Sequence, residues 1–301
     1  MTSFAKTKHL FMIRALSGFF LVFSFVHAAQ AQFFIGPAAS GAGSSGRAAI
    51  DAGESSFLNP ASVAFLHRYN ASLYYGAFQE PREGSANLWG VSLADGTEDS
   101  FIPGALSYIR KINNLPDNSG DTQQDIQFSL ATEPIRKLAI GLSGHRLSDQ
   151  ILSSLSGVEY DQYNMTLGAI YTPLPSFGIG VVGYDIFPFA DDAPVGIHVV
   201  PTFALAGNFV YEKTFRARFD LIRPDTNNNG RRTNFAAGIE TFFAERLAFR
   251  TGCYWRETAD QTYISAGLGY LGPKLSIDYS FQQDVRNGYN YRHLIDLWLP
   301  L

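Results

Sequence analysis

From Asn70 onward the sequence is a series of short segments in which apolar and polar residues alternate, and this series constrains the fold more than any other feature. The clearest segment, LSIDYSFQ at positions 275–282, places an apolar residue at every odd position and a polar one at every even position. Successive side chains of a strand point to opposite faces, so a period of two predicts strands with one apolar face. We count about fourteen such segments, with twelve as the alternative.

The connections between these segments alternate in length. Short turns at 132–137, 172–176, 212–214, 244–246 and 271–274 alternate with longer polar loops at 113–124, 148–159, 187–197, 223–233 and 283–290. Short turns at one end and longer loops at the other are typical of an outer-membrane barrel. The connections 94–103 and 257–261 depart from this pattern. An even number of strands would return the carboxyl terminus to the end of the barrel at which the series begins.

Composition narrows the alternatives. Only 17% of the residues are charged, 25 are Phe and 15 are Tyr, and the mean hydropathy is −0.03. The hydropathy excludes a polytopic helical membrane protein, and the aromatic content argues against disorder. A soluble sandwich or lipocalin-like barrel would have to bury all the apolar faces inside one domain. We therefore predict an all-β fold, a transmembrane antiparallel β-barrel.

The first 31 residues have the organisation of a cleavable signal peptide. Lys6, Lys8 and Arg14 precede an apolar stretch at 15–26, and Ala29-Gln30-Ala31 forms an A-x-A site. Position 32 is Gln, which excludes a lipoprotein signal. Removal of this leader changes the formal charge from −4 to −7, so nucleic acid is not an expected partner. We expect residues 69–301 to form a barrel in the outer membrane with both mature termini in the periplasm.

Residues 32–68 lie between the leader and the first strand and show neither helical nor strand periodicity. The stretch 46–66, GRAAIDAGESSFLNPASVAFL, is rich in small residues and predicts a compact plug that the strands wrap around. Its candidate functional residues are Gly46, Arg47, Asp51, Asn59, Pro60 and Ala61. Just before it, Gly41-Ala-Gly43-Ser-Ser-Gly46 matches G-x-G-x-x-G but lacks a preceding strand, and we expect a flexible lead into the plug.

The Gly-Arg-Ala step, the small and acidic stretch and the Asn-Pro-Ala step of the plug resemble the hatch of the FadL family of outer-membrane transporters. Similar hatches occur in PorV-like barrels of the same superfamily. The resemblance implies a barrel of fourteen strands that binds or takes up hydrophobic molecules of the fatty acid or lipid class. It also implies capture among the extracellular loops and a lateral exit into the membrane through a gap in the wall.

Charged residues recur on the polar faces of the predicted strands. They are Arg216, Arg218, Glu240, Arg250, Asp278 and Asp296. Such charges either pair among themselves in the lumen or hold the plug through Asp51, Glu54 or Arg47. A buried plug charge without a partner would be costly, so we expect one or two of them to contact the plug.

Two functions remain open on these residues. The first is a compact transporter with a small apolar capture site at Ile151, Leu152, Phe187 and Phe189, and with Gly178, Gly180 and Gly183 permitting a kink in the wall. The second is a structural barrel that self-associates, holds lipid or serves as a platform for a partner protein. The loops are shorter than those of fatty-acid transporters, which is consistent with the second.

Catalytic and metal-binding motifs are not expected. The histidines show no ligand spacing and there is no G-x-S-x-G elbow, so we predict no enzyme activity, no cofactor and no metal site. The opening of an EF-hand loop at 225–230 lacks the required Glu, because the twelfth position is Ala236. The expected partners are outer-membrane lipid, a lipophilic ligand, a homo-oligomer and the barrel-assembly machinery, which would read the alternating final strand that ends in Leu299 and Leu301.

Overall fold

The computed structural model describes residues 34–51, 53–80, 84–114, 120–152, 157–187, 190–191, 198–225 and 233–301. The expected signal peptide, residues 1–31, lies outside these ranges. None of the helices in the described ranges is long and apolar enough to cross a membrane.

The described chain begins with three short helices and continues with strands. The helices are α2 (Pro37–Gly41), α3 (Ser55–Leu58) and η1 (Pro60–Phe65), and a further turn, η2 (Glu257–Ala259), lies between strands. The strands are β1 (Tyr69–Glu80), β2 (Gly84–Asp95), β3 (Gly104–Asn114), β4 (Gly120–Ile135), β5 (Leu138–Leu152), β6 (Gly157–Leu174), β7 (Phe177–Tyr184), β8 (Ala190–Asp191), β9 (Thr202–Tyr211), β10 (Phe215–Pro224), β11 (Asn234–Phe243), β12 (Leu247–Arg256), β13 (Gln261–Leu271), β14 (Ser276–Asp284) and β15 (Tyr291–Pro300).

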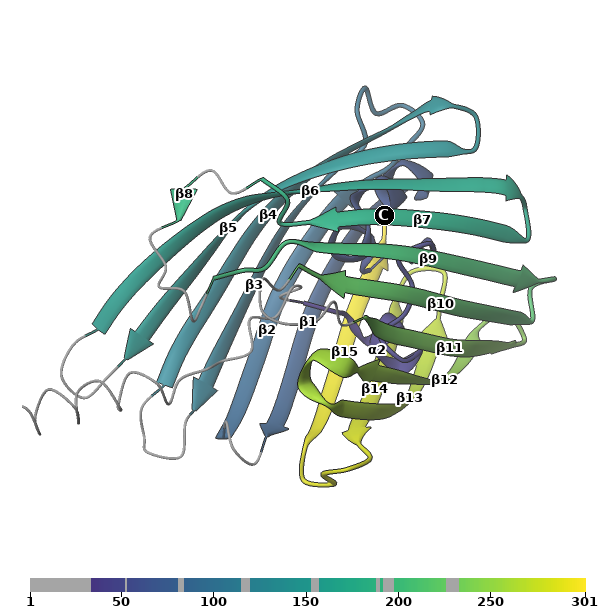
Figure 1. The fold of residues 1–301 in the computed structure, drawn as a ribbon. Coiled ribbons are helices and arrows are strands. Elements are labelled where there is room, and N and C mark those ends of the chain that lie inside the picture. Colours follow the sequence, from purple (N-terminus) through teal and green to yellow (C-terminus); the bar gives the residue numbers. More distant parts are fainter. Residues whose placement is uncertain are drawn as a thin grey trace, which may run out of the picture.

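The strands form one closed antiparallel barrel (Figure 1). Apart from β8, each strand pairs with the strands before and after it in sequence, so that β7 pairs with β9. Strand β1 also pairs with β15, from Asn70↔Pro300 to Gln79↔Tyr291, which closes the ring. The two-residue β8 is an addition at the edge of β6 and is not part of the wall. The barrel therefore has 14 strands, which confirms the higher of the two predicted counts.

Alternation divides each strand between the two faces of the wall. In β2, Leu88, Gly90 and Ser92 are buried, whereas Trp89, Val91 and Leu93 are exposed. The exposed large apolar side chains are spread over the outer face of the whole barrel, and most of the buried charged side chains point into its interior. This arrangement is the reverse of a soluble barrel and suits a wall surrounded by lipid.

The observed strand limits differ from the expected ones mainly at the loop end. Strands β4, β5 and β6 extend beyond the expected segments at that end, for example from 125–131 to Gly120–Ile135 in β4. Polar residues such as Asp121 and Gln123 continue the β4–β5 pairing, because backbone hydrogen bonds do not require an apolar side chain. Strand β9 is shorter than expected and begins at Thr202 instead of His198.

Inward-facing glycines allow the plug to approach the wall backbone directly. A Cβ added at Gly238 would lie 2.2 Å from the carbonyl oxygen of Ala42 and 2.5 Å from its carbon. Gly141, Gly180 and Gly252 face other plug backbone atoms in the same way. By contrast, a Cβ added at Gly207 on β9 would meet no atom within 4 Å. The absence of side chains at Gly141, Gly180, Gly238 and Gly252 therefore leaves the space that the plug backbone occupies.

We predict that Gly238→Leu displaces the plug from β11 and lowers the free energy of unfolding by about 1–3 kcal/mol through overpacking. Denaturant unfolding in detergent micelles, followed by tryptophan fluorescence, would measure it. Gly207→Leu is the matched control and should change stability by less than about 0.5 kcal/mol. Equal effects of the two substitutions would contradict the close contact between plug and wall.

Candidate functional site: the plug and the wall around it

The described part of the plug, residues 34–66, lies inside the barrel (Figure 1). Helix α2 packs against β12, β13, β14 and β15, and η1 packs on the opposite side against β3, β4, β5 and β6. Nearly all side chains of this segment are buried, including the charged Arg47 and Glu54. The stretch 41–46 is therefore not the flexible lead that we expected. This stretch packs directly against the wall strands. Gly43 has a left-handed conformation (φ 69°), and its N–H donates to Ser265 Oγ at 2.9 Å.

A buried ion pair joins the plug to β10. Arg47 Nη1 lies 2.7 Å from Asp220 Oδ2, and the two side chains are 2% and 0% exposed. The backbone N–H groups of Gly46 and Arg47 donate to the same oxygen at 2.9 and 3.2 Å. Arg47 Nε also donates to Tyr184 Oη at 3.0 Å. Sequence reasoning singled out Arg47 but missed Asp220 as its partner.

A second set of charges begins at Asp51 and runs around the wall. Asp51 lies 2.9 Å from Arg216 Nη1 and 2.6 Å from Arg218 Nη1. Both arginines contact Glu240, which in turn lies 2.6 Å from Arg250 Nε.

The chain of charges then reaches the last strands. Arg250 pairs with Asp278, whose backbone N–H donates to Asp296 Oδ1 at 3.1 Å. The structure thus brings all six expected lumen charges into one network. Two of its members, Arg216 and Arg218, contact the plug.

The two plug carboxyls have opposite electrostatic surroundings. Burial alone would raise the pKa of Asp51, but Arg218 and Arg216 lower it to about 2, and this carboxyl is ionised. Burial and then the negative charge of Asp51 raise the pKa of Glu54 to about 8. Among the described residues Glu54 forms no direct ion pair with a cation, and it accepts hydrogen bonds from the N–H groups of Ala38 and Ala39 at the start of α2.

The opposite side of the plug meets a belt of hydroxyl groups. Ser56 Oγ lies 3.2 Å from Ser107 Oγ, which is 2.8 Å from Ser92 Oγ. Gln127 Nε2 donates to the carbonyl oxygen of Ser56 at 2.8 Å and to Ser143 Oγ at 3.0 Å. Sequence reasoning missed this belt. Its signal was present as small polar residues at inward positions of neighbouring strands.

The Asn-Pro-Ala step organises the end of the plug. Asn59 Oδ1 accepts from the N–H of Ala61 at 3.1 Å, and Pro60 opens η1. Asn59 Nδ2 donates to the carbonyl oxygen of Arg47 at 2.9 Å, which ties the two ends of the motif together. These residues shape the plug and do not line an open path.

A different polar group lies above the plug toward the loops. His145 on β5 lies between two carboxylates, with Nδ1 3.0 Å from Asp125 Oδ1 and Nε2 2.6 Å from Asp185 Oδ1. Asp185 follows the end of β7 in a left-handed conformation (φ 54°). Their sequence separations of 20 and 40 residues gave no pattern from which to predict the group. It ties the end of β7 to β4 and β5, across β6.

The wall changes character where β7 ends. The β6–β7 pairing runs only from Leu174↔Phe177 to Leu167↔Gly183, and the Ile186 N–H then donates to the Met165 carbonyl oxygen at 3.0 Å. Beyond Met165, the described residues give β6 only the two-residue β8 as a partner on this side. In the described part of the chain, the wall between β6 and β9 therefore has no continuous strand pairing toward the loop end.

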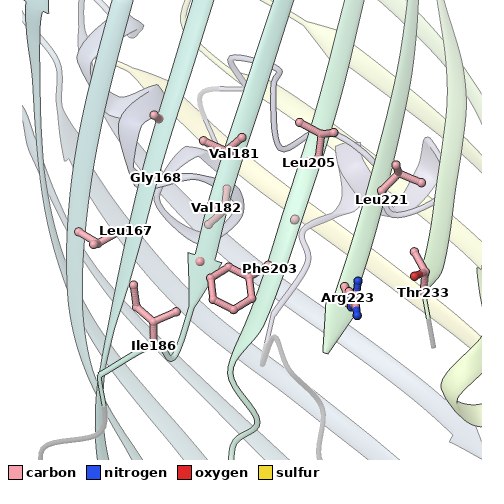
Figure 2. Close-up of a pocket in the computed structure, with 13 residues that line it drawn as sticks. Leu167, Gly168, Val181, Val182, Ile186, Phe203, Leu205, Leu221, Arg223 and Thr233 are labelled. Atoms are coloured by element: carbon pink, nitrogen blue, oxygen red, sulfur yellow. The ribbon is translucent and has the colours of Figure 1, made fainter. Parts of the chain in front are cut away.

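Apolar side chains cover both faces of the wall at this point. Inside, a buried cluster consists of Val182, Tyr184, Ala204, Ile222 and Ala236, with Tyr254 against it. A pocket of about 630 Å³ lies across β6, β7, β9 and β10 (Figure 2). Most of its lining belongs to the outer face, including Leu167, Val181, Gly183, Phe203, Leu205 and Leu221. We call it the outer groove.

Only two of the four expected capture residues have described side chains, so the capture site stays a prediction. Ile151 is half-buried near the end of β5, and Phe187 is 51% exposed after β7. The side chain of Leu152 and the whole of Phe189 lie outside the described residues. Among the described residues, no group of three or more His, Cys, Asp or Glu side chains could hold a metal ion.

We predict that Asp220→Asn destabilises the barrel by about 3–5 kcal/mol, because it leaves the Arg47 guanidinium buried without its counter-charge. Denaturant unfolding would measure the change. Glu245→Gln breaks the exposed pair with Lys213, where both side chains are at least 70% exposed, and should cost less than about 1 kcal/mol. A small effect of Asp220→Asn would show that the plug does not depend on this pair.

Glu54 also makes the seating of the plug depend on pH. The docked plug binds a proton on Glu54 up to about pH 8, whereas a released plug would lose it near the usual value of 4.5. Docking is therefore favoured most below pH 4.5, and this contribution is lost as the pH rises through 8. We expect ion conductance in planar bilayers to rise between pH 5 and 8.5, and Glu54→Gln to remove that rise. A rise that persists in Glu54→Gln would exclude Glu54 as its source.

We compared the sequence and the structure with those of known proteins, and only solved structures matched. No protein-family model matches the sequence, and a search of the curated proteins found no match. Among solved structures, the CymD monoaromatic hydrocarbon channel is 14% identical, covers 89% of this chain and 97% of its own, and has a TM-score of 0.69. The toluene transporter TbuX of Ralstonia pickettii is 13% identical over 88% of this chain and 97% of its own, with a TM-score of 0.67.

A FadL homologue of Pseudomonas aeruginosa is 12% identical, covers 88% of this chain and 98% of its own, and has a TM-score of 0.62. These structural neighbours are FadL-family channels, and each is matched over nearly its whole length. The chain thus has the 14-stranded barrel fold of the FadL-type hydrophobic-compound channels.

Proposed function

We propose that this chain is an outer-membrane channel that takes up small hydrophobic molecules and releases them sideways through its wall at the end of β7. The observation that carries the proposal is the coincidence of three features at one place. The β6–β7 pairing stops at Leu167↔Gly183, an apolar cluster lies on the inner face, and the outer groove lies on the outer face. The charged side chains next to this place are already paired, Arg47 with Asp220 and Asp185 with His145, so an apolar molecule would cross beside neutralised groups.

The plug supports a sideways route over a straight one. Passage along the barrel axis would have to break the Arg47–Asp220 pair and the contacts of Asp51, all of them buried. Removal of one member of such a buried pair costs several kcal/mol. The plug is also seated on wall glycines that leave no space for a side chain. A route through the incomplete wall leaves these interactions intact.

The inner apolar cluster favours an uncharged ligand. Its members are aliphatic or aromatic, and the nearby Arg47 is already paired with Asp220. A fatty acid would bring a carboxylate that finds no free cation in this cluster, whereas a neutral hydrocarbon needs none. The channel activities named for CymD and TbuX are consistent with this choice. The proposed class is thus narrower than the fatty acid or lipid class that the plug resemblance implies.

The proposed location is the outer membrane, with the long loops at the cell surface. The apolar outer face of the wall supports residence in a bilayer, since soluble proteins rarely expose so many large apolar side chains. In this orientation the start of β1, which follows the plug, and the end of β15 both lie on the periplasmic side. The expected leader would direct export, and the alternating strand β15 would be read by the barrel-assembly machinery.

Uptake of labelled toluene and labelled oleate by bacterial cells that express the protein would test the proposal. We expect faster uptake of toluene than in cells without the protein, and little change for oleate. Ala204→Trp fills the inner apolar cluster next to Val182 and should return toluene uptake to the level of empty cells. Ala217→Trp, on the outer face of the same wall, adds the same side chain elsewhere and should leave uptake unchanged.

The outcome separates this proposal from a structural barrel. If uptake of neither toluene nor oleate exceeds that of empty cells while a gel-shift assay shows folded protein in the outer membrane, the proposed transport is excluded. A stable oligomer in native mass spectrometry would then favour the structural function. Faster uptake of oleate than of toluene would return the ligand to the fatty acid class.

A further inference from the structure

The outer groove is lined by apolar side chains and has Arg223 at one end. An apolar groove that ends at a cation is suited to an amphiphilic ligand. We propose that the outer groove binds one membrane lipid with a phosphate head group, its acyl chain in the groove and its phosphate on Arg223. The inference concerns the outer face of the wall alone and does not rest on the proposed transport.

Alternation along the strands places the groove on the face toward the bilayer. In β7 a Cβ added at Gly180 would point at the carbonyl oxygen of Arg47 in the plug, so the even-numbered positions of this strand face inward. Val181 therefore faces outward, and it is 48% exposed. Phe203 and Leu205 on β9 are 55% and 48% exposed, between the buried Thr202, Ala204 and Ala206.

The shape of the groove suits an acyl chain. Figure 2 shows the larger side chains Leu167, Val181 and Phe203 along the groove. In the strand register Gly183 lies between Leu167 and Phe203, and the small Ala169 pairs with Val181. Its volume of about 630 Å³ is within the range of sites that enclose most of a ligand. Because these side chains differ in size, the outer wall is hollowed here and can hold a chain in place.

Arg223 supplies the polar end. It lies on the outer face near the end of β10, is exposed, and lines the groove together with Thr233. Among the described residues it forms no ion pair with a carboxylate. Glu257 is close to this end and accepts a hydrogen bond from the backbone N–H of Thr233 at 2.9 Å. The guanidinium in Figure 2 is thus a cation beside an apolar groove at the rim of the barrel.

A guanidinium in this position selects for phosphate. On the lipid-facing side of a barrel a cation is tolerated near the interface, where it contacts head groups. Its planar fork matches the oxygens of a phosphate in a bidentate arrangement. Lipid is the solvent of this face and is always present at high concentration, whereas a transported molecule passes at low concentration. Mass action therefore favours a resident lipid over a transported amphiphile.

Native mass spectrometry tests the proposal on the full-length protein. The protein is exchanged into detergent containing equal amounts of phosphatidylglycerol and diacylglycerol with identical chains, together with oleate. We expect one phosphatidylglycerol to remain on the wild-type protein in preference to diacylglycerol, which lacks the phosphate. Arg223→Gln should lower that preference about tenfold, as expected for loss of a charge-assisted bidentate contact. Arg246→Gln, an exposed arginine at the opposite rim, is the control and should retain it.

A second pair of variants locates the acyl chain. Ala169→Trp fills the groove and should remove the retained lipid, while Ala217→Trp adds the same side chain outside the groove and should retain it. A gel-shift assay confirms that each variant is folded. Equal retention of phosphatidylglycerol and diacylglycerol by the wild type, preferential retention of oleate, or full retention in folded Ala169→Trp would each overturn the proposal.

Discussion

The pairing of β1 with β15 joins the first strand to the last, and the arrangement of the molecule follows from this closure. A backbone N–H or C=O left without a partner in hydrocarbon costs several kcal/mol, so a sheet in a bilayer cannot have an open edge. Once the ring is closed, the period of two fixes which residues face lipid and which face the lumen. The inward positions then carry Arg218, Glu240, Arg250 and Asp278, charges that need partners within the lumen.

The plug supplies partners for the inward-facing charges of the wall, and the same ion pairs hold the plug in place. Its Asp51 completes the set of acids around Arg216 and Arg218, and its Arg47 neutralises Asp220, which would otherwise be buried alone. On the other side the contacts are uncharged: Ser107 bonds to the Ser56 hydroxyl, Gln127 donates to the Ser56 carbonyl oxygen, and wall glycines leave space for the plug backbone. Plug and wall are thus mutually dependent, and displacement of the whole plug would expose several charges at once.

The wall is weakest where it is least polar. At the end of β7 the strand pairing stops, and the lumen side is lined by Val182, Ala204 and Ile222 instead of charges. The His145 group, anchored on β4 and β5, reaches across β6 to Asp185 and holds this end of β7 in place. The same part of the wall therefore carries both proposed sites. The exit for an apolar molecule begins on its inner face, and the binding site for a membrane lipid lies on its outer face.

The sequence by itself determined the fold class and the faces of most strands, and it limited the number of strands to fourteen or twelve, because a period of two and the spacing of turns are local properties. LSIDYSFQ at 275–282 could be assigned to two faces without any knowledge of its neighbours. The sequence also indicated which charges face inward, among them Arg216 and Arg218. It did not identify the pairs Arg47–Asp220 and His145–Asp185, which join residues 173 and 40 positions apart.

Only the tertiary structure decided these pairs, the burial of the stretch 41–46 and the early end of β7. Each depends on where the closed ring brings distant strands together, and no local pattern records that. The glycine-rich stretch 41–46 looked flexible in isolation because glycine permits many conformations. In the barrel the same residues are the ones small enough to fit against β11 and β12, so the property that suggested mobility is what allows them to be fixed.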